Sequence, residues 1–108
     1  MVDDYCQLKR FSATCAADEV IVMTRAKYGR MRLGTCITVD YGALGCSGNV
    51  LAKVDRKCSG RQTCEFAVAE LDGSQPCPND LTVYLEAGYR CQKGTSLISF
   101  MICLVFCH

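Results

Sequence analysis

The sequence predicts a small, disulfide-rich domain of the mainly β or α+β class. The chain has 108 residues, enough for one domain and too few for two, and ten of them are cysteine. A short chain this rich in cysteine is typical of a disulfide scaffold. Segments 19–26 and 81–91 are rich in residues that favour strands, and segment 49–58 has apolar residues at helical spacing.

Three segments are predicted to form strands. Residues 19–26, EVIVMTRA, contain four β-branched residues and indicate a largely buried strand. Residues 81–91, LTVYLEAGYRC, alternate in part and lead into a cysteine, which indicates a second strand. Residues 64–71, CEFAVAEL, are a third candidate, although alanine and glutamate also allow a helix there. Segments rich in Gly, Pro, Asn, Asp and Ser are predicted to be loops: 33–36, 40–49 and 71–80.

Residues 49–58, NVLAKVDRKC, predict one short helix. Val50, Leu51, Val54 and Cys58 recur at a spacing that places them on one helical face. Asn49 is a suitable residue to cap the first turn, and Ser59 with Gly60 would end the helix.

Composition excludes several function classes. The 12 basic and 11 acidic residues give a net charge of +1, so no basic excess favours nucleic acid as a partner. There is no CxxC pair, and the single histidine is the last residue, His108, so neither a metal site nor another cofactor is expected. With no histidine inside the domain, no Ser/His/Asp set can be assembled, and an enzyme is not expected.

The cysteine content indicates an oxidising compartment, so the expected location is extracellular or at the cell surface. The first ten residues, MVDDYCQLKR, contain two acidic residues and no apolar stretch, so they are not a signal peptide. We therefore expect a chain whose signal has been removed, or a fragment of a longer secreted or surface protein.

Residues 96–108, SLISFMICLVFCH, form an apolar tail that we separate from a domain spanning 1–95. The tail has about a dozen apolar residues, whereas a spanning helix needs about 20. Three interpretations stay open: a buried terminal strand, a membrane anchor truncated after Thr95, and a gene-model or splice artefact. Such an anchor is the only contact with a membrane that we expect. Cys103 and Cys107 belong to the tail and are placed outside the main cysteine framework.

Eight cysteines and two motifs in order carry a resemblance to a known family. The motifs are AKYGR at 26–30, and QPC at 75–77 followed by Tyr84-Leu85 and Tyr89-Arg90-Cys91. The match runs from about Tyr5 to Cys91. In this arrangement the chain resembles the sea-urchin-egg-lectin (SUEL) type domain, the galactose- or rhamnose-binding lectin domain of egg lectins and latrophilin-type receptors. The eight cysteines that carry the spacing are Cys6, Cys15, Cys36, Cys46, Cys58, Cys64, Cys77 and Cys91.

The resemblance implies a fold that the spacing alone does not give. It implies compact, sandwich-like antiparallel sheets with one or two short helices and long ordered loops. Because eight cysteines allow 105 connectivities, the pairing also comes from the resemblance alone. The implied bridges are Cys6–Cys36, Cys15–Cys91, Cys46–Cys77 and Cys58–Cys64.

The resemblance also implies where a sugar would bind. Lectins of this family use an acidic residue after the first cysteine, the tyrosine of the YGR segment and the loop after D-P-C with its lysine. Here Gln7 replaces the acid, Tyr28 is kept, and Asn79 and Asp80 stand in the loop. The lysine position holds Thr82 or Val83, and Arg30 is a candidate to supply the missing cation.

We therefore expect calcium-independent binding of galactose- or rhamnose-like sugars, with a glycan or glycoprotein as the ligand. The candidate site would join an exposed loop formed by Tyr28, Gly29 and Arg30 to segment 76–81. Three charged positions of the family are altered: Gln7 and Gln75 replace acidic residues, and Thr82 or Val83 replaces the lysine. An extracellular adhesion module that binds a cell-surface protein is therefore the alternative. A structural role is the alternative for the individual residues: Tyr28 as a core-edge residue, Gly29 as a turn with positive φ, and Arg30 in a surface ion pair.

Overall fold

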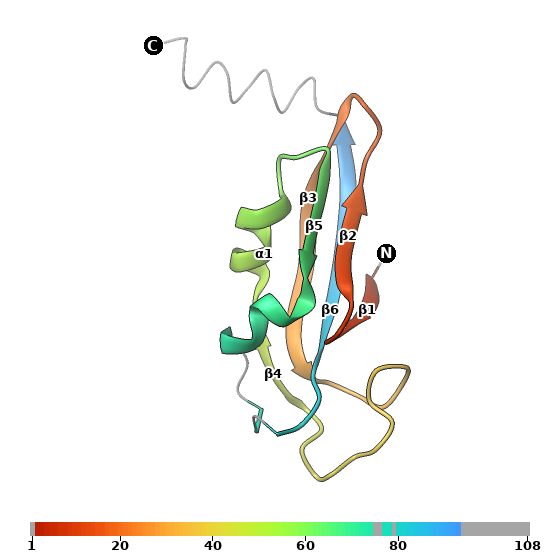
Figure 1. Cartoon of the computed structure of the whole chain (residues 1–108). Coiled ribbons are helices and arrows are strands. Elements are labelled where there is room, and N and C mark those ends of the chain that lie inside the picture. Colours follow the sequence, from red (N-terminus) through yellow and green to blue (C-terminus); the bar gives the residue numbers. More distant parts are fainter. Residues whose placement is uncertain (1, 75–76, 79, 94–108) are drawn as a thin grey trace.

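The computed structural model of the chain describes residues 2–74, 77–78 and 80–93. These residues form two antiparallel sheets that pack face to face (Figure 1), which confirms the predicted fold class. The larger sheet has the order β1 (Val2–Cys6), β6 (Tyr84–Lys93), β3 (Glu19–Arg30) and β4 (Cys46–Asn49). The smaller sheet pairs β2 (Arg10–Thr14) with β5 (Thr63–Ala67).

Two short helices complete the described part of the chain. The helix α1 (Leu51–Cys58) confirms the predicted helix, and it begins one residue after Val50. Asn49 Oδ1 accepts a hydrogen bond from the backbone N of Leu51 at 2.9 Å, so its side chain satisfies a free amide of the first turn. The helix ends before Gly60, whose φ of 87° is accessible to glycine at little cost. The second helix, η1 (Val68–Ser74), is a 3-10 helix.

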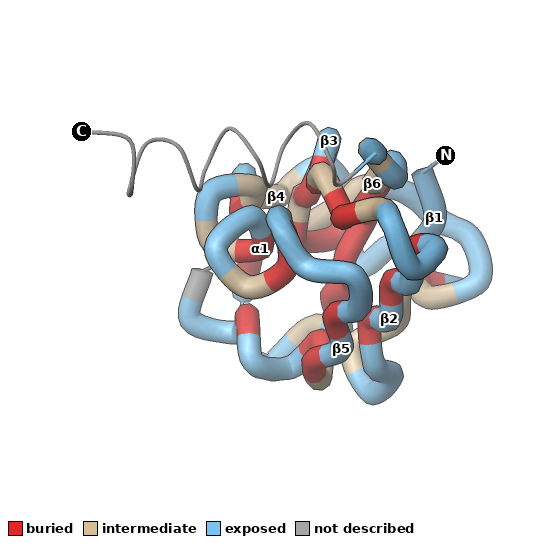
Figure 2. Tube along the Cα trace, turned by 90° about the horizontal axis from the view of Figure 1, so that it is seen from above, coloured by how far each residue is buried: buried red, intermediate tan, exposed pale blue. Residues whose placement is uncertain are grey.

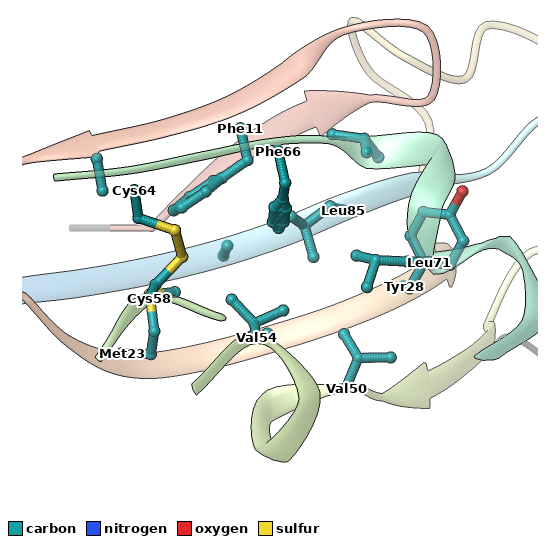
Figure 3. Packing of buried hydrophobic residues seen from close by; sticks show 14 of the residues in the cluster. Phe11, Met23, Tyr28, Val50, Val54, Cys58, Cys64, Phe66, Leu71 and Leu85 are labelled. Atoms are coloured by element: carbon teal, nitrogen blue, oxygen red, sulfur yellow. A yellow bond between two sulfur atoms is a disulfide. The ribbon is translucent and has the colours of Figure 1, made fainter. Parts of the chain in front are cut away.

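The core lies between the sheets and beneath α1. Figure 3 shows Phe11 of β2 and Phe66 of β5 facing Leu85 of β6, with Val54 of α1 closing one side. The rings of Phe11 and Phe66 have centroids 5.2 Å apart. The buried positions run along the inner faces of the strands, and exposed positions cover the turns and the outer side of α1 (Figure 2). Burial alternates along β2 and β5, whereas β6 is buried continuously from Tyr84 to Gly88.

Several parts of the secondary structure differ from the sequence prediction. The strand predicted over 19–26 continues to Arg30 as β3, and the strand predicted over 81–91 begins at Tyr84 and ends at Lys93 as β6. Segment 40–49 was expected to be a loop, but its last four residues form β4, which pairs with Lys27–Arg30. Segment 64–71 is a strand only as far as Ala67 and continues as η1. Strands β1 and β2 were not predicted, because their sequences, VDDYC and RFSAT, are short and largely polar. These strands form because partner strands supply the hydrogen bonds, which local propensity does not record.

The outer face of the larger sheet carries a network of charged groups around Glu86 of β6. Glu86 is buried, and its carboxylate accepts hydrogen bonds from Arg25 Nε at 2.6 Å and Arg32 Nη1 at 2.5 Å. Arg32 also pairs with Asp4 at 2.9 Å. Burial raises the pKa of Glu86, but the bonds from the two arginines outweigh that effect and hold it below its ordinary value.

The described residues contain four disulfides, with the pairing that the resemblance implies. Cys6–Cys36 and Cys46–Cys77 lie at the end of the domain where β6 begins. Cys15–Cys91 and Cys58–Cys64 lie toward the opposite end. All eight cysteines of the framework are thus paired with one another.

The apolar tail, with Cys103 and Cys107, lies outside the described residues, so the interpretations of the tail stay untested. Among the residues that the structure describes, no helix combines the length and apolar character that crossing a membrane requires.

Candidate functional site

Four segments converge at the end of the domain where β6 begins, at the lower end of Figure 1. They are the β1–β2 turn at residues 7–9, the long β3–β4 connection at 31–45, η1, and residues 80–83 before β6. The strand register brings them together, because Cys6 and Gly29 both pair with Tyr84. Gln7, Asp80, Thr82 and Val83 belong to these segments, and Tyr28, Gly29 and Arg30 form the adjoining end of β3.

Gln7, Tyr28 and Asp72 form a hydrogen-bonded cluster at this end. Gln7 Nε2 donates to Asp72 Oδ1 at 3.2 Å, and the Tyr28 hydroxyl donates to the same oxygen. Gln7 Oε1 accepts a long bond of 3.5 Å from the backbone N of Val83. We call these three residues the Gln7–Tyr28–Asp72 cluster. It places one side-chain amide beside one carboxylate, with Gln7 half-buried and Asp72 exposed.

The position of Asp72 follows from the apolar residues of η1. Val68 and Leu71 are both fully buried in the core, so η1 is held against the sheet. Figure 3 shows Leu71 beside the ring of Tyr28, with the Tyr28 hydroxyl pointing away from the other core side chains. Asp72 follows Leu71 directly and therefore emerges next to that hydroxyl.

Tyr28 is a core residue, and the prediction that it forms an exposed loop wall is wrong. It lies within β3 and has no exposed surface, because β3 continues to Arg30 and directs the ring inward. Burial, followed by the hydrogen bond and negative charge of Asp72, raises the pKa of Tyr28. The hydroxyl therefore keeps its proton and serves as a donor to Asp72. Its ring packing matches the structural alternative considered from the sequence.

Gly29 lies in β3 and is needed for a close approach of two strands, so neither the predicted loop nor the turn considered as its alternative is formed. A Cβ at this position would lie 2.2 Å from the backbone O of Cys46. Only glycine lets β4 pair with β3 here, because no other residue could avoid that contact without moving the backbone.

Arg30 is buried and holds two loops together, so the prediction of an exposed Arg30 is wrong, and the surface ion pair considered as its structural alternative is not formed. Its Nη1 donates to the backbone O of Thr82 at 2.6 Å, and its Nη2 donates to the backbone O of Val39 at 2.7 Å. The planar guanidinium has donors at fixed angles, which suits two carbonyls on separate segments. Arg30 therefore fixes the β3–β4 connection against the segment before β6.

The remaining candidates separate into different places. Asp80 is exposed and lines a cavity with Arg30 and Tyr41. In the described part of the chain, Asp80 has no hydrogen bond to Gln7, Tyr28 or Asp72. Asn79 lies outside the described residues. Of the two positions considered for the family's lysine, Thr82 is exposed and Val83 is buried in the core. A lysine at Val83 would therefore place a charge in the apolar core.

Sequence reasoning missed Asp72. The comparison of motifs directed attention to the position before Pro76, where the family has an aspartate and this chain has Gln75. One signal for Asp72 was available in the sequence: it is a carboxylate directly after the apolar residue Leu71, in the predicted loop 71–80 that also carries Asn79 and Asp80. Only the three-dimensional structure shows that this carboxylate bonds to Tyr28 and Gln7.

The family model of the D-galactoside/L-rhamnose binding SUEL lectin domain matches residues 13–91 of the chain. The chain belongs to the SUEL lectin family. This SUEL lectin domain is similar to two curated proteins named Latrophilin Cirl. That of Drosophila mojavensis is 33% identical over 91 residues, and that of Drosophila ananassae is 32% identical over 91 residues. Each match covers 80% of this chain and 5% of the relative, so the chain spans a small part of the proteins it matches.

Proposed function

We propose that this SUEL lectin domain binds a galactose- or rhamnose-like sugar, without calcium, through Gln7 and Asp72. The observation that carries this proposal is the pairing of a half-buried amide with an exposed carboxylate at 3.2 Å. Sugar recognition uses planar polar groups that bond to neighbouring hydroxyls. A carboxylate accepts strong hydrogen bonds from hydroxyls, and an amide both donates and accepts.

Tyr28 acts in this proposal as a positioning residue. Because its ring is fully buried, it cannot offer a surface to a ligand. Its hydroxyl occupies one lone pair of Asp72 Oδ1 and fixes the orientation of that carboxylate. The second oxygen of Asp72 is left to accept hydroxyl hydrogens from the sugar. A pre-oriented acceptor lowers the entropic cost of binding.

The proposal that calcium is not required rests on the small number of acidic groups in the cluster. Calcium takes about six to eight oxygen ligands in protein sites, several of them carboxylates. The cluster offers the single carboxylate of Asp72, and its Oδ1 already accepts bonds from Tyr28 and Gln7. Binding should therefore depend on hydrogen bonds alone.

We further propose that the domain functions outside the cell or on its surface and binds its ligand without chemical turnover. The four disulfides support the location, since such bonds persist in oxidising compartments. Membership of a lectin family supports binding as the activity.

The proposed function is tested by calorimetric titration of the oxidised domain with L-rhamnose and with D-galactose. We expect weak binding of at least one sugar, unchanged by EDTA. Asp72→Asn should weaken it about ten- to a hundredfold, because a hydrogen bond to a charged group contributes about 1.5–3 kcal/mol. Asp18→Asn is the matched control, because Asp18 is an exposed carboxylate in the β2–β3 turn that pairs with Lys93. Equal effects of the two substitutions would contradict a site at Asp72.

A second candidate function is recognition of a cell-surface protein by the same end of the domain. The exposed apolar side chains of Leu33 and Val39, both on the β3–β4 connection, favour this alternative. Exposed apolar residues near a rigid polar rim are common in protein interfaces. Absence of binding to every sugar on a glycan array would favour a protein ligand.

A further inference from the structure

A cavity lies beside the Gln7–Tyr28–Asp72 cluster, between the β3–β4 connection and the segment before β6. Its volume is about 400 Å³, and its lining includes Arg30, Thr38, Tyr41, Asp80 and Thr82. Pockets that bind small molecules in proteins measure about 300–1,000 Å³. The cavity is therefore large enough for one sugar unit.

The walls of the cavity are held in place from three directions. Arg30 bonds to Val39 on one wall and to Thr82 on the other. The disulfide Cys6–Cys36 ties the first wall to the end of β1, and Cys46–Cys77 ties the chain before the second wall to β4. A cavity with fixed walls needs little reorganisation when a ligand enters, which favours binding.

The chemistry of the lining suits a sugar ring. Tyr41 is 71% exposed and offers an aromatic face to the C–H groups of a pyranose. Asp80 is exposed and offers a carboxylate to its hydroxyls, and the hydroxyls of Thr38 and Thr82 add donors and acceptors. Arg30 places a buried positive charge beside the cavity.

A single peptide group separates this cavity from the Gln7–Tyr28–Asp72 cluster. The carbonyl O of Thr82 accepts from Arg30 Nη1 at 2.6 Å, and the amide N of Val83 donates to Gln7 Oε1 at 3.5 Å. These two atoms belong to the same peptide unit, whose C=O and N–H point in opposite directions. From standard bond lengths, Arg30 Nη1 and Gln7 Oε1 are at most about 9 Å apart, a span that two linked sugar units cover.

We propose that the cavity is a second glycan subsite, which binds the sugar unit next to the one held by Gln7 and Asp72. Tyr41 stacks against the ring of this second unit, and Asp80 accepts hydrogen bonds from its hydroxyls. The domain then prefers a disaccharide or longer glycan to a monosaccharide. This inference rests on the proposed function, because the first subsite must hold the terminal sugar.

The test compares monosaccharides with disaccharides by calorimetric titration. The probes are methyl α-L-rhamnoside and methyl β-D-galactoside, against lactose and melibiose, which both carry a terminal galactose. For the wild-type domain we expect at least one disaccharide to bind about tenfold more tightly than the galactoside. Tyr41→Ala should remove this gain and leave the affinity for the monosaccharides unchanged. Tyr41→Phe keeps the ring and should retain the gain.

The possible failures are distinguishable. Monosaccharide binding with no gain for either disaccharide would overturn the second subsite and leave the proposed function intact. An equal loss of mono- and disaccharide binding in Tyr41→Ala would place Tyr41 in the first subsite and overturn the assignment of the cavity. Binding of none of the four probes would overturn both proposals.

Discussion

Tyr28 donates its hydroxyl hydrogen to Oδ1 of Asp72, and this bond links the buried core to an exposed carboxylate. The ring of Tyr28 packs among the core residues of β3, η1 and α1, so its hydroxyl has little freedom to move. Asp72 is therefore held by a rigid donor although it lies on the surface. The buried Tyr28 thus sets the orientation of the Asp72 carboxylate, which is accessible to a ligand.

Substitutions at Tyr28 should separate its role in the core from its role in the cluster. Tyr28→Phe keeps the ring and removes the hydrogen bond to Asp72. Sugar affinity should therefore fall, while the free energy of unfolding, measured in urea, should decrease by only about 1 kcal/mol. Tyr28→Ala should lower the free energy of unfolding by about 3–5 kcal/mol, because it leaves a cavity in the core. A sugar affinity unchanged in Tyr28→Phe would show that Asp72 needs no positioning by this hydroxyl.

Removing individual disulfides should affect stability and binding differently. In the chain-entropy description the stabilisation grows with the closed loop, from about 2 kcal/mol for Cys58–Cys64 to about 4 kcal/mol for Cys15–Cys91. Replacing both cysteines of the Cys46–Cys77 bridge by alanine should weaken sugar binding, because this bridge anchors the segment before residues 80–83. The matched alanine pair at Cys58 and Cys64, near the opposite end, should leave binding unchanged. Stability is measured by urea unfolding and binding by titration, and equal losses of binding in the two variants would contradict this account.

Arg30→Lys should loosen the two loops that Arg30 joins. A lysine ammonium cannot bond to the carbonyls of Val39 and Thr82 with the fixed geometry of a guanidinium. Hydrogen exchange of the backbone amides in residues 37–42 and 80–83 should become faster, measured by mass spectrometry. Arg56→Lys, at an exposed position of α1, is the control and should leave exchange in both segments unchanged. Unchanged exchange in Arg30→Lys would mean that the disulfides alone fix these loops.

The domain should lose stability in acid, because protonation of Glu86 removes its favourable interaction with Arg25 and Arg32. Because the pKa of folded Glu86 lies below its ordinary value of 4.5, its contribution is complete above about pH 4.5 and is lost as the pH falls through the folded value. At neutral pH Glu86→Gln should reduce the free energy of unfolding by about 1–3 kcal/mol, since two arginines lose a charged partner. The difference between wild type and variant should shrink as the pH is lowered.

Urea unfolding at several pH values measures this effect. Glu65→Gln is a suitable control, because Glu65 forms an exposed pair with Arg10, and such pairs contribute about 0–1 kcal/mol. A constant difference between wild type and Glu86→Gln at every pH would show that the effect of Glu86 is not electrostatic.

The sequence predicted those elements whose own residues favour them. The β-branched run in β3 and the apolar spacing of α1 are local signals, and both elements formed, although β3 continues four residues beyond the predicted end at Ala26. Strand β4 could not be predicted, because Cys46, Ser47 and Gly48 have little strand propensity and pair only because Gly29 lets the backbone approach. Strand β4 therefore depends on its pairing with β3, a contact that is distant in the sequence.

The location of a sugar site stays a prediction, but the structure shows which candidate side chains are exposed. The motif directed attention to Tyr28 and Arg30 as exposed residues, but a strand places both side chains inside the domain. The exposed appearance of YGR came from its glycine and charge, which are ordinary signs of a loop. Asp72 was missed because its importance depends on the packing of Leu71, a tertiary contact that no local pattern records.

The central claim is that a sugar binds at Gln7 and Asp72, and an NMR titration tests it most directly. The ¹⁵N-labelled oxidised domain is titrated with L-rhamnose and with D-galactose in the presence of EDTA. The account predicts shifts of the Gln7 side-chain amide and of the backbone amides of Asp72 and Val83, all three lost in Asp72→Asn. Amides near Cys15 and Cys91, at the opposite end, should stay unchanged. Shifts confined to that opposite end, or the absence of any shift at high sugar concentration, would contradict the account.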